Sequence, residues 1–202
     1  MYLSQLMVNP RSRQARTDLA DRYELHRTIL NAFPETLPDH ERVLYRVEEG
    51  SLEPIIRLLV QSQTVPDWEA IPRLRGNYLL DAPQVRSVEV RVPKGVPVRF
   101  RLQANPTVKR DGKRHAIYKD TDLEGWLVKK AAQSGFTVDP AHVTIVKLGK
   151  KRGKGGKVWH AVQFDGVLTV TDTDLFTQTV QKGVGSAKAF GFGLLSIPLA
   201  NA

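Results

Sequence analysis

The chain has 202 residues, of which 41% are hydrophobic, and 30 Lys and Arg outnumber 21 Asp and Glu to give a formal net charge of +9. This length allows one domain or two small ones with a buried core. There is no cysteine, which excludes disulfides, thiolate zinc sites and cysteine nucleophiles. No apolar run approaches the length of a membrane span, and the N-terminus lacks the pattern of a signal peptide. We therefore expect a soluble, cytoplasmic protein with no membrane partner.

The first half of the sequence predicts one helix among several strands. The helix is expected over 21–33, and the strands over 2–8, 42–48, 55–62 and 85–92. A second helix would have to precede the last of these strands. Pro66 and Pro72 leave little room for it there.

The second half opens with the clearest alternation of the chain, over 96–104, where apolar residues alternate with Arg and Gln. Strands are expected there and over 142–148, 158–170 and 194–197, and helices over 122–134 and 173–182. The first of these helices has Leu123, Trp126, Leu127 and Ala131 on one stripe, and Gly135 ends it. Strand-helix-strand-strand-helix-strand is the ferredoxin-like order. The sequence thus predicts an α+β protein with two tandem ferredoxin-like domains, 1–92 and 93–202.

Positive charge gathers in two short segments, 107–119 and 147–157, and the rest of the chain is nearly neutral. The second segment is expected to form the tip of a long hairpin. Clustered cations gain free energy by displacing the counterions condensed on nucleic acid, which predicts a nucleic-acid ligand. A solvated charged face is the alternative for either segment alone. The candidate contacts are Lys109, Arg110, Lys113, Arg114, Lys150, Lys151, Arg152, Lys154 and Lys157.

The segment 183–193 is rich in glycine around a single lysine, Lys188. Its glycines are Gly183, Gly185, Gly191 and Gly193. A backbone with so few side chains suits close approach to a ligand, and the basic segments indicate that this ligand is a polyanion. A flexible linker is the alternative, but Phe190, Phe192 and Leu194 must pack somewhere, which disfavours it.

The predicted helix over 21–33 carries the candidate catalytic pair, Tyr23 and His26. At about 100° per residue the two lie one turn apart, on the flank of the stripe that we expect to be buried. That stripe consists of Leu25, Thr28, Ile29 and Ala32. Imidazole titrates near neutrality and can pass a proton to or from a reacting oxygen, whereas a phenol mostly donates a hydrogen bond. The alternative is that both residues pack against the other domain, since their spacing is not specific to catalysis.

The sequence predicts neither a metal site nor a cofactor. The remaining histidines are scattered, and no pair of them combines metal-ligand spacing with a nearby carboxylate. The Gly-rich segment matches neither a phosphate loop nor a dinucleotide fingerprint, because glycines required by each pattern are missing.

Four segments carry a resemblance to a known family. They are Tyr23-Glu-Leu-His-Arg with the following Phe33-Pro34, then 100–106, 162–170 and 183–196. Together they resemble CasE, the CRISPR-associated endoribonuclease of type I-E systems in the RAMP superfamily, and they occur in the family's order. The resemblance implies two ferredoxin-like domains and cleavage of the CRISPR repeat in precursor RNA at the foot of its stem-loop. It also implies that the product stays bound and joins the other subunits of the Cascade complex.

The resemblance places the family's catalytic histidine on His26, its helper tyrosine on Tyr23 and its glycine loop on 183–193. It also implies that a basic residue of the hairpin holds RNA, without distinguishing among the cations at 150–154. The mechanism that fits is metal-independent attack by a ribose 2′-hydroxyl on the adjacent phosphate, giving a 2′,3′-cyclic phosphate and a 5′-hydroxyl. Which of the two residues is acid and which is base stays open. Lys188 and the loop amides are candidates for holding phosphates.

Two other functions stay open at this point. One is a non-catalytic RNA-binding RAMP subunit of a CRISPR effector complex, in which Tyr23 and His26 only pack. The other is a DNA-binding or ribosome-associated protein that uses the same basic loops. A requirement for the 2′-hydroxyl at one linkage separates the nuclease from both.

Overall fold

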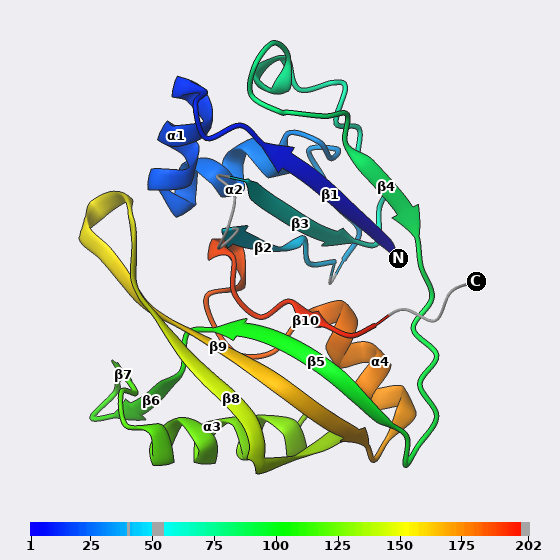
Figure 1. Cartoon of the computed structure of the whole chain (residues 1–202), viewed down its shortest axis with the longest axis vertical. Coiled ribbons are helices and arrows are strands. Elements are labelled where there is room, and N and C mark those ends of the chain that lie inside the picture. The colour runs from blue at the N-terminus through cyan, green and yellow to red at the C-terminus, as the bar shows by residue number, and fades with distance from the viewer. Residues whose placement is uncertain (40, 50–54, 199–202) are drawn as a thin grey trace. The chain divides into compact units, whose positions relative to one another are not determined.

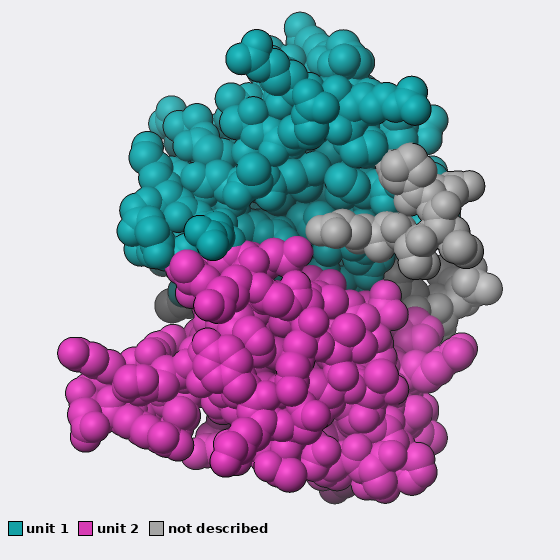
Figure 2. Space-filling model, turned by 60° about the vertical axis from the view of Figure 1, so that its left-hand side comes forward, with its two compact units in different colours: residues 1–89, 152–157, 189–191 teal, residues 90–151, 158–188, 192–202 magenta. Residues whose placement is uncertain are grey.

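The structure, a computed structural model, describes residues 1–39, 41–49 and 55–198. The chain forms two compact units, which Figure 2 shows in different colours. Unit 1 comprises residues 1–89, 152–157 and 189–191, and unit 2 comprises residues 90–151, 158–188 and 192–202. Two short segments from late in the sequence therefore pack with the N-terminal part of the chain. Among the described residues, no helix is both long enough and apolar enough to cross a membrane.

Unit 1 contains an antiparallel sheet of four strands in the order β2-β3-β1-β4 (Figure 1). The strands are β1 (Tyr2–Val8), β2 (Leu44–Glu49), β3 (Ile56–Ser62) and β4 (Gln84–Ser87). The predicted bounds of β1 are confirmed. β4 ends five residues before its predicted end, and all of its side chains are exposed, so it adds an edge strand but little to the core.

The helices of unit 1 are α1 (Arg13–Ala20) and α2 (Arg22–Leu30), and Asp21 separates them. α2 corresponds to the predicted helix, whereas α1 was not predicted, because it buries Ala15 and Asp18 alone and shows no apolar stripe. Where the prolines leave little room for a second helix, the chain forms the short 3₁₀ helix η1 (Pro72–Leu74). Leu25 and Ile29 of α2 belong to the same buried cluster as the sheet residues Leu6 and Val60. This apolar packing fixes which face of α2 is turned away from the core.

A buried carboxylate ties the helices of unit 1 together. Asp18 is fully buried and accepts hydrogen bonds from the hydroxyls of Thr28, at 2.8 Å, and Tyr78, at 2.9 Å. The guanidinium of Arg73 adds an ion pair at 2.9 Å. Burial, followed by the neighbouring Asp18 carboxylate, raises the pKa of Tyr78, so this phenol stays a hydrogen-bond donor at any ordinary pH. α1, α2 and the segment after η1 are thus joined by one polar network.

Unit 2 contains a second four-stranded sheet, in the order β10-β5-β9-β8. Its strands are β5 (Pro97–Ala104), β8 (Phe136–Gly153), β9 (Lys157–Val170) and β10 (Leu195–Ser196). With the strands of each four-stranded sheet counted in chain order, the first strand lies between the third and the fourth, and the second lies at the edge. The prediction of an α+β protein with two ferredoxin-like sheets is confirmed.

Two helices pack on the sheet of unit 2, namely α3 (Asp120–Ala132) and α4 (Thr173–Lys182). Trp126 of α3 stacks on Phe164 of β9 with ring centroids 5.8 Å apart, and Phe176 of α4 meets Phe136 edge-on. The predicted stripe of α3 is the set of residues that the helix buries, and the predicted bounds of α4 are confirmed. Gly135 follows α3 with a φ of 77°, as expected of a helix terminator.

The hairpins of unit 2 differ from the prediction in two ways. β8 runs to Gly153, so part of the basic segment expected to be a loop is strand, and the tip is the 3₁₀ turn η2 (Lys154–Gly156). The other basic segment forms a hairpin that was not predicted, made of β6 (Thr107–Arg110) and β7 (Lys113–Ala116). Asp111 and Gly112 form its two-residue turn, both with positive φ.

Candidate functional site

The candidate catalytic residues lie on α2, in unit 1. Asp21 begins the helix, and its Oδ1 atom accepts the backbone N–H of Tyr23 at 2.9 Å. Leu25 and Ile29 are buried, which leaves His26 half-buried on the flank and Tyr23 47% exposed. The predicted division of this helix into a buried stripe and a more exposed flank is therefore confirmed.

His26 lies beside two aromatic rings. Its ring centroid is 6.3 Å from that of Tyr45, with 28° between the ring planes, and 6.5 Å from that of Phe190 in the short helix η3 (Lys188–Phe190). Loss of hydration in this partly buried position lowers the pKa of His26 below its ordinary value. The imidazole is therefore neutral at neutral pH and can accept a proton.

Tyr45 of β2 supports this arrangement and was not identified from the sequence. It is fully buried, and its hydroxyl donates a hydrogen bond to the carbonyl of Arg22 at 3.1 Å. Burial raises its pKa, so the phenol remains protonated. A Cβ at Gly191 would lie 2.8 Å from the Tyr45 ring, and Gly191 has a φ of 82°. Any side chain at position 191 would be strained and would push against the ring that stacks on His26.

The tip of the basic hairpin meets the start of α2 within unit 1. The backbone N–H of Lys154 donates to Oδ1 of Asp21 at 3.3 Å, the same oxygen that accepts from Tyr23. The tip residues Arg152, Lys154 and Lys157 are exposed. The structure thus brings this tip to the N-terminal end of the helix that carries Tyr23 and His26.

The remaining basic candidates belong to unit 2. Lys150 and Lys151 lie on β8, and Lys109, Arg110, Lys113 and Arg114 lie exposed on the β6–β7 hairpin. Lys147, in the same run as the hairpin tip, forms an ion pair with Asp120 at 2.7 Å. The positive charge of Lys147 is therefore balanced by Asp120. The sequence had indicated a segment 147–157 whose cations are all available to a ligand.

The glycines of the C-terminal loop lie close to other parts of the protein. Gly183 ends α4 with a φ of 74° and donates its N–H to Thr179. A Cβ at Gly185 would lie 3.2 Å from the Trp126 ring, and one at Gly193 would lie 2.7 Å from the carbonyl of Val184. The N–H groups of Gly183 and Gly193 donate to backbone carbonyls, so they are not offered to a phosphate. Much of the loop's glycine content thus serves packing within the chain.

The described residues contain no group of three or more His, Cys, Asp or Glu side chains placed to hold a metal ion. His142 pairs with Asp139 at 2.8 Å, but both side chains are exposed and lie three residues apart on β8. His160 is buried near Tyr118, with ring centroids 4.5 Å apart. These two histidines therefore belong to local structure around β8 and β9.

Comparison with known proteins covers both units. A family model described as "CRISPR associated protein" matches residues 1–198. The chain is 35% identical to the CRISPR-associated endoribonuclease Cse3 of Thermus thermophilus, over 98% of this chain and 99% of that protein. The chain belongs to the CasE/Cse3 family. Within this family it is also 30% identical to the Cascade subunit CasE of Escherichia coli, over 98% of each chain.

A solved structure of a CasE/Cse3 family member has the same fold. Thermus thermophilus Cse3 bound to an RNA representing a pre-cleavage complex superposes with a TM-score of 0.86, at 33% identity and over 98% of each chain. The family resemblance found in the four sequence segments is therefore confirmed along the whole chain. The similarity spans both α2 and the long hairpin.

Proposed function

We propose that this chain is a metal-independent endoribonuclease that cleaves the CRISPR repeat stem-loop in precursor CRISPR RNA and then retains the product as a subunit of Cascade. The observation that carries the proposal is His26, a half-buried neutral imidazole one helical turn from the exposed Tyr23. The names of the relatives, an endoribonuclease and a Cascade subunit, agree with it.

The reaction is an in-line displacement at phosphorus. The ribose 2′-oxygen forms a bond to the adjacent phosphorus, and the bond from phosphorus to the 5′-oxygen of the next nucleotide breaks. The 2′-hydroxyl loses its proton and the departing 5′-oxygen gains one, so the products are a 2′,3′-cyclic phosphate and a 5′-hydroxyl. The enzyme must hold the phosphate in line, move these two protons and stabilise the charge on the phosphorane.

His26 takes the first proton. Its lowered pKa leaves the imidazole unprotonated at neutral pH, which is the form that a general base requires. Tyr23, exposed on the same flank, orients the scissile phosphate through its hydroxyl or assists the departing oxygen. The rings of Tyr45 and Phe190 restrict the His26 side chain, and a restricted base meets the substrate in fewer unproductive positions.

The RNA is held mainly by cations outside α2. The proposed contacts are the basic residues of the long hairpin and of the β6–β7 hairpin, together with Lys188 and the glycine loop, apart from the N–H groups of Gly183 and Gly193, which donate within the chain. A-form RNA has a deep, narrow major groove, so recognition rests on stem shape and on phosphates. In this assignment an N-terminal domain over 1–92 carries the chemistry, and a C-terminal domain over 93–202 supplies most of the phosphate contacts.

The test is incubation of the purified protein with a synthetic repeat stem-loop RNA in excess EDTA, followed by analysis of the product ends. Cleavage should persist and leave a 2′,3′-cyclic phosphate, and a single 2′-deoxy substitution at the scissile linkage should abolish it. Loss of activity on chelation, with recovery in magnesium, would refute the metal-independent mechanism. Binding of the RNA without any cleavage would instead favour the non-catalytic RAMP subunit.

A further inference from the structure

Asp21 binds two parts of the protein that lie far apart in the sequence. Its Oδ1 atom accepts the backbone N–H of Tyr23 at 2.9 Å, which caps α2, and also the backbone N–H of Lys154 at 3.3 Å. Lys154 lies 133 residues further along the chain, at the tip of the long hairpin. Asp21 and the tip segment 152–157 belong to the same compact unit. One carboxylate oxygen thus joins the helix that carries His26 to a tip that carries candidate RNA contacts.

Capping of α2 does not require the second of these bonds. An N-cap side chain serves the helix by accepting an N–H from its first turn, and Tyr23 supplies that N–H. The bond from Lys154 comes from another element and satisfies no N–H group of the helix. Its effect is therefore on the position of the hairpin tip.

The contact holds the tip by its backbone and leaves its charges available. Arg152, Lys154 and Lys157 are exposed, and none of the three forms an ion pair within the part of the chain that the structure describes. An ion pair between Asp21 and one of these side chains would offset its charge. Because Asp21 accepts a main-chain N–H instead, the side-chain cations stay free to bind phosphates.

The turn at the end of the tip is loosely packed. Gly155 and Gly156 both have positive φ, and no described atom lies within 4 Å of a Cβ built at either residue. Glycines with open space around them leave the backbone free to adopt other conformations. The position of this tip therefore depends on individual contacts such as the bond from Lys154 to Asp21.

Cleavage requires the bound phosphate and the proton-transfer group to meet in one geometry, and a misplacement of about 1 Å can cost about a hundredfold in rate. A tip that bound RNA at a distance from α2 would hold the phosphates away from His26. We infer that Asp21 is a positioning residue, which holds the hairpin tip beside α2 so that the cations of Arg152 and Lys154 act on the phosphate that His26 serves. This inference rests on the proposed function, because Asp21 affects cleavage only through the tip.

Two substitutions separate this role from helix capping. Asp, Asn and Ser are comparable N-cap residues, so Asp21→Asn and Asp21→Ser should both preserve α2 and the melting temperature. The Asn oxygen occupies the place of Oδ1 and still accepts from Lys154, whereas the Ser hydroxyl is one bond closer to the backbone and reaches the helix alone. Asp21→Ser should slow single-turnover cleavage about tenfold at saturating protein. Asp21→Asn should cleave nearly as fast as the parent, and both should bind the stem-loop as the parent does.

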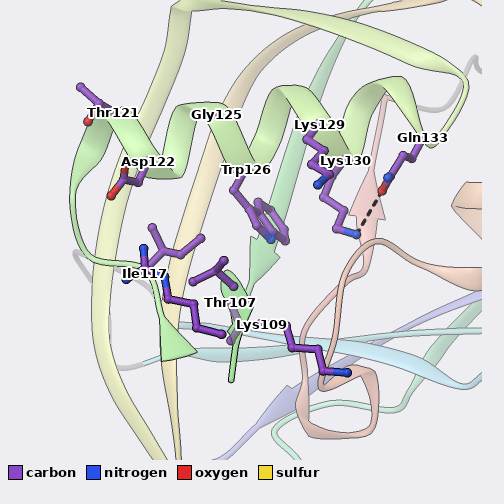
Figure 3. Close-up of a pocket in the computed structure, with 12 residues that line it drawn as sticks. Thr107, Lys109, Ile117, Thr121, Asp122, Gly125, Trp126, Lys129, Lys130 and Gln133 are labelled. Carbon is purple, nitrogen blue, oxygen red and sulfur yellow. Dashed lines mark hydrogen bonds between the residues drawn. The ribbon is translucent and has the colours of Figure 1, made fainter. Parts of the chain in front are cut away.

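A double-mutant cycle tests whether Asp21 acts through the tip. In an Arg152→Ala, Lys154→Ala background the tip lacks these two cations, so adding Asp21→Ser should slow cleavage little further. Lys130→Ala provides the matched background. Figure 3 shows Lys130 on α3, in unit 2, where its ammonium donates to the side-chain oxygen of Gln133 at 3.2 Å. Asp21→Ser should keep its full effect there, because the tip is intact.

Hydrogen exchange adds a measurement that needs no RNA. The amides of 152–157 should exchange faster in Asp21→Ser than in Asp21→Asn, while the amides of α2 exchange alike in both. Equal cleavage rates of these two variants would overturn the inference. Equal effects of Asp21→Ser in the tip background and in Lys130→Ala would also overturn it, because Asp21 would then act on α2 alone.

The outcome for the proposed function can be read separately. If the parent protein cleaves no RNA, the proposed function fails and the inference fails with it. If the parent cleaves the stem-loop and Asp21→Ser cleaves it equally fast, the inference fails alone.

Discussion

The two units share one strand order but differ in where they place their functional side chains. In unit 1 the candidate catalytic residue His26 lies against buried rings, on a helix whose neighbour is fixed by the Asp18 network. Most candidate RNA contacts lie on strands of unit 2, on β8 and on the exposed β6–β7 hairpin, and the tip of the long hairpin adds exposed cations within unit 1. Proton transfer needs a group held in place with a shifted pKa, which requires partial burial. Phosphate binding needs charge within reach of a polyanion, which requires exposure.

His26→Ala tests whether the half-buried imidazole of unit 1 carries out proton transfer. Of the variants proposed, it should have the largest effect on the cleavage rate. Loss of a proton-transfer group typically costs two to four powers of ten in rate, so single-turnover cleavage should slow by about that factor. Binding of the stem-loop should remain nearly intact, because His26 lies outside the buried stripe of α2. Cleavage at the parent rate, or an unfolded variant, would identify His26 as a packing residue.

Tyr23→Phe is the matched variant on the same helix flank. It keeps the ring and removes the hydroxyl, so it should cost less rate than His26→Ala. Circular dichroism and stem-loop affinity, measured on both variants, separate a chemical effect from a folding defect.

Asp18→Ala tests whether the fixed position of α2 depends on the polar network of unit 1. It leaves the buried hydroxyls of Thr28 and Tyr78 without their acceptor, and it removes the partner of Arg73. We expect the unfolding free energy to fall by about 3 kcal/mol, at the lower end for a broken buried pair because Arg73 is partly exposed. Urea unfolding measures this decrease.

The control for this variant is Asp165→Ala in unit 2. Asp165 pairs with Arg101 across β5 and β9 at 2.7 Å, but both side chains are partly exposed. Exposed pairs contribute at most about 1 kcal/mol. Equal destabilisation by the two variants would show that the Asp18 network has no special role in holding the helices.

Alanine substitutions in the long hairpin test whether the exposed cations supply the affinity for RNA. Replacing Lys150, Lys151, Arg152 and Lys154 with alanine should weaken stem-loop binding, and the salt slope should fall by about one for each phosphate that is no longer bound. Single-turnover cleavage at saturating protein should change much less than binding. Lys147→Ala is the control within the same run, because Lys147 is already paired with Asp120. An unchanged slope would mean that the hairpin is an ordinary solvated tip.

Local patterns were sufficient to predict most of the fold. The alternation in β5, the apolar stripe of α3 and the capped, amphipathic α4 are properties of neighbouring residues, so the sequence reveals them. α1 and the β6–β7 hairpin were missed because they bury few apolar side chains. The Asp-Gly pair at the turn of that hairpin was the available signal.

The candidate site was less predictable than the fold, because it depends on contacts between distant residues. Tyr23 and His26 lie one turn apart on a helix, which sequence spacing can indicate. Tyr45 comes from a strand and Phe190 from near the end of the chain, and nothing in their local sequence places them beside His26. The same holds in part for Gly191, which has a positive φ and also lies against the distant Tyr45 ring.

The smallest expected effect is a displacement of the pH profile of kcat/KM. It follows from the contacts of His26 with the rings of Tyr45 and Phe190. A base must be unprotonated to accept the 2′-hydroxyl proton, so kcat/KM should fall as the pH drops through the pKa of His26 in the free enzyme. Burial lowers that pKa, so the acid limb should lie below the ordinary imidazole value of about 6.5.

Phe190→Ala should return water to the His26 ring, raise its pKa and move the acid limb toward higher pH. Leu175→Ala, a truncation of an exposed side chain on α4 in unit 2, should leave the limb in place. If kcat/KM instead fell as the pH rose through the pKa of His26, the protonated imidazole would be the active form, and His26 would then be the acid. A limb that stays fixed in Phe190→Ala would show that the neighbouring ring does not set the protonation state of His26, leaving the helix and Tyr45 as its remaining determinants.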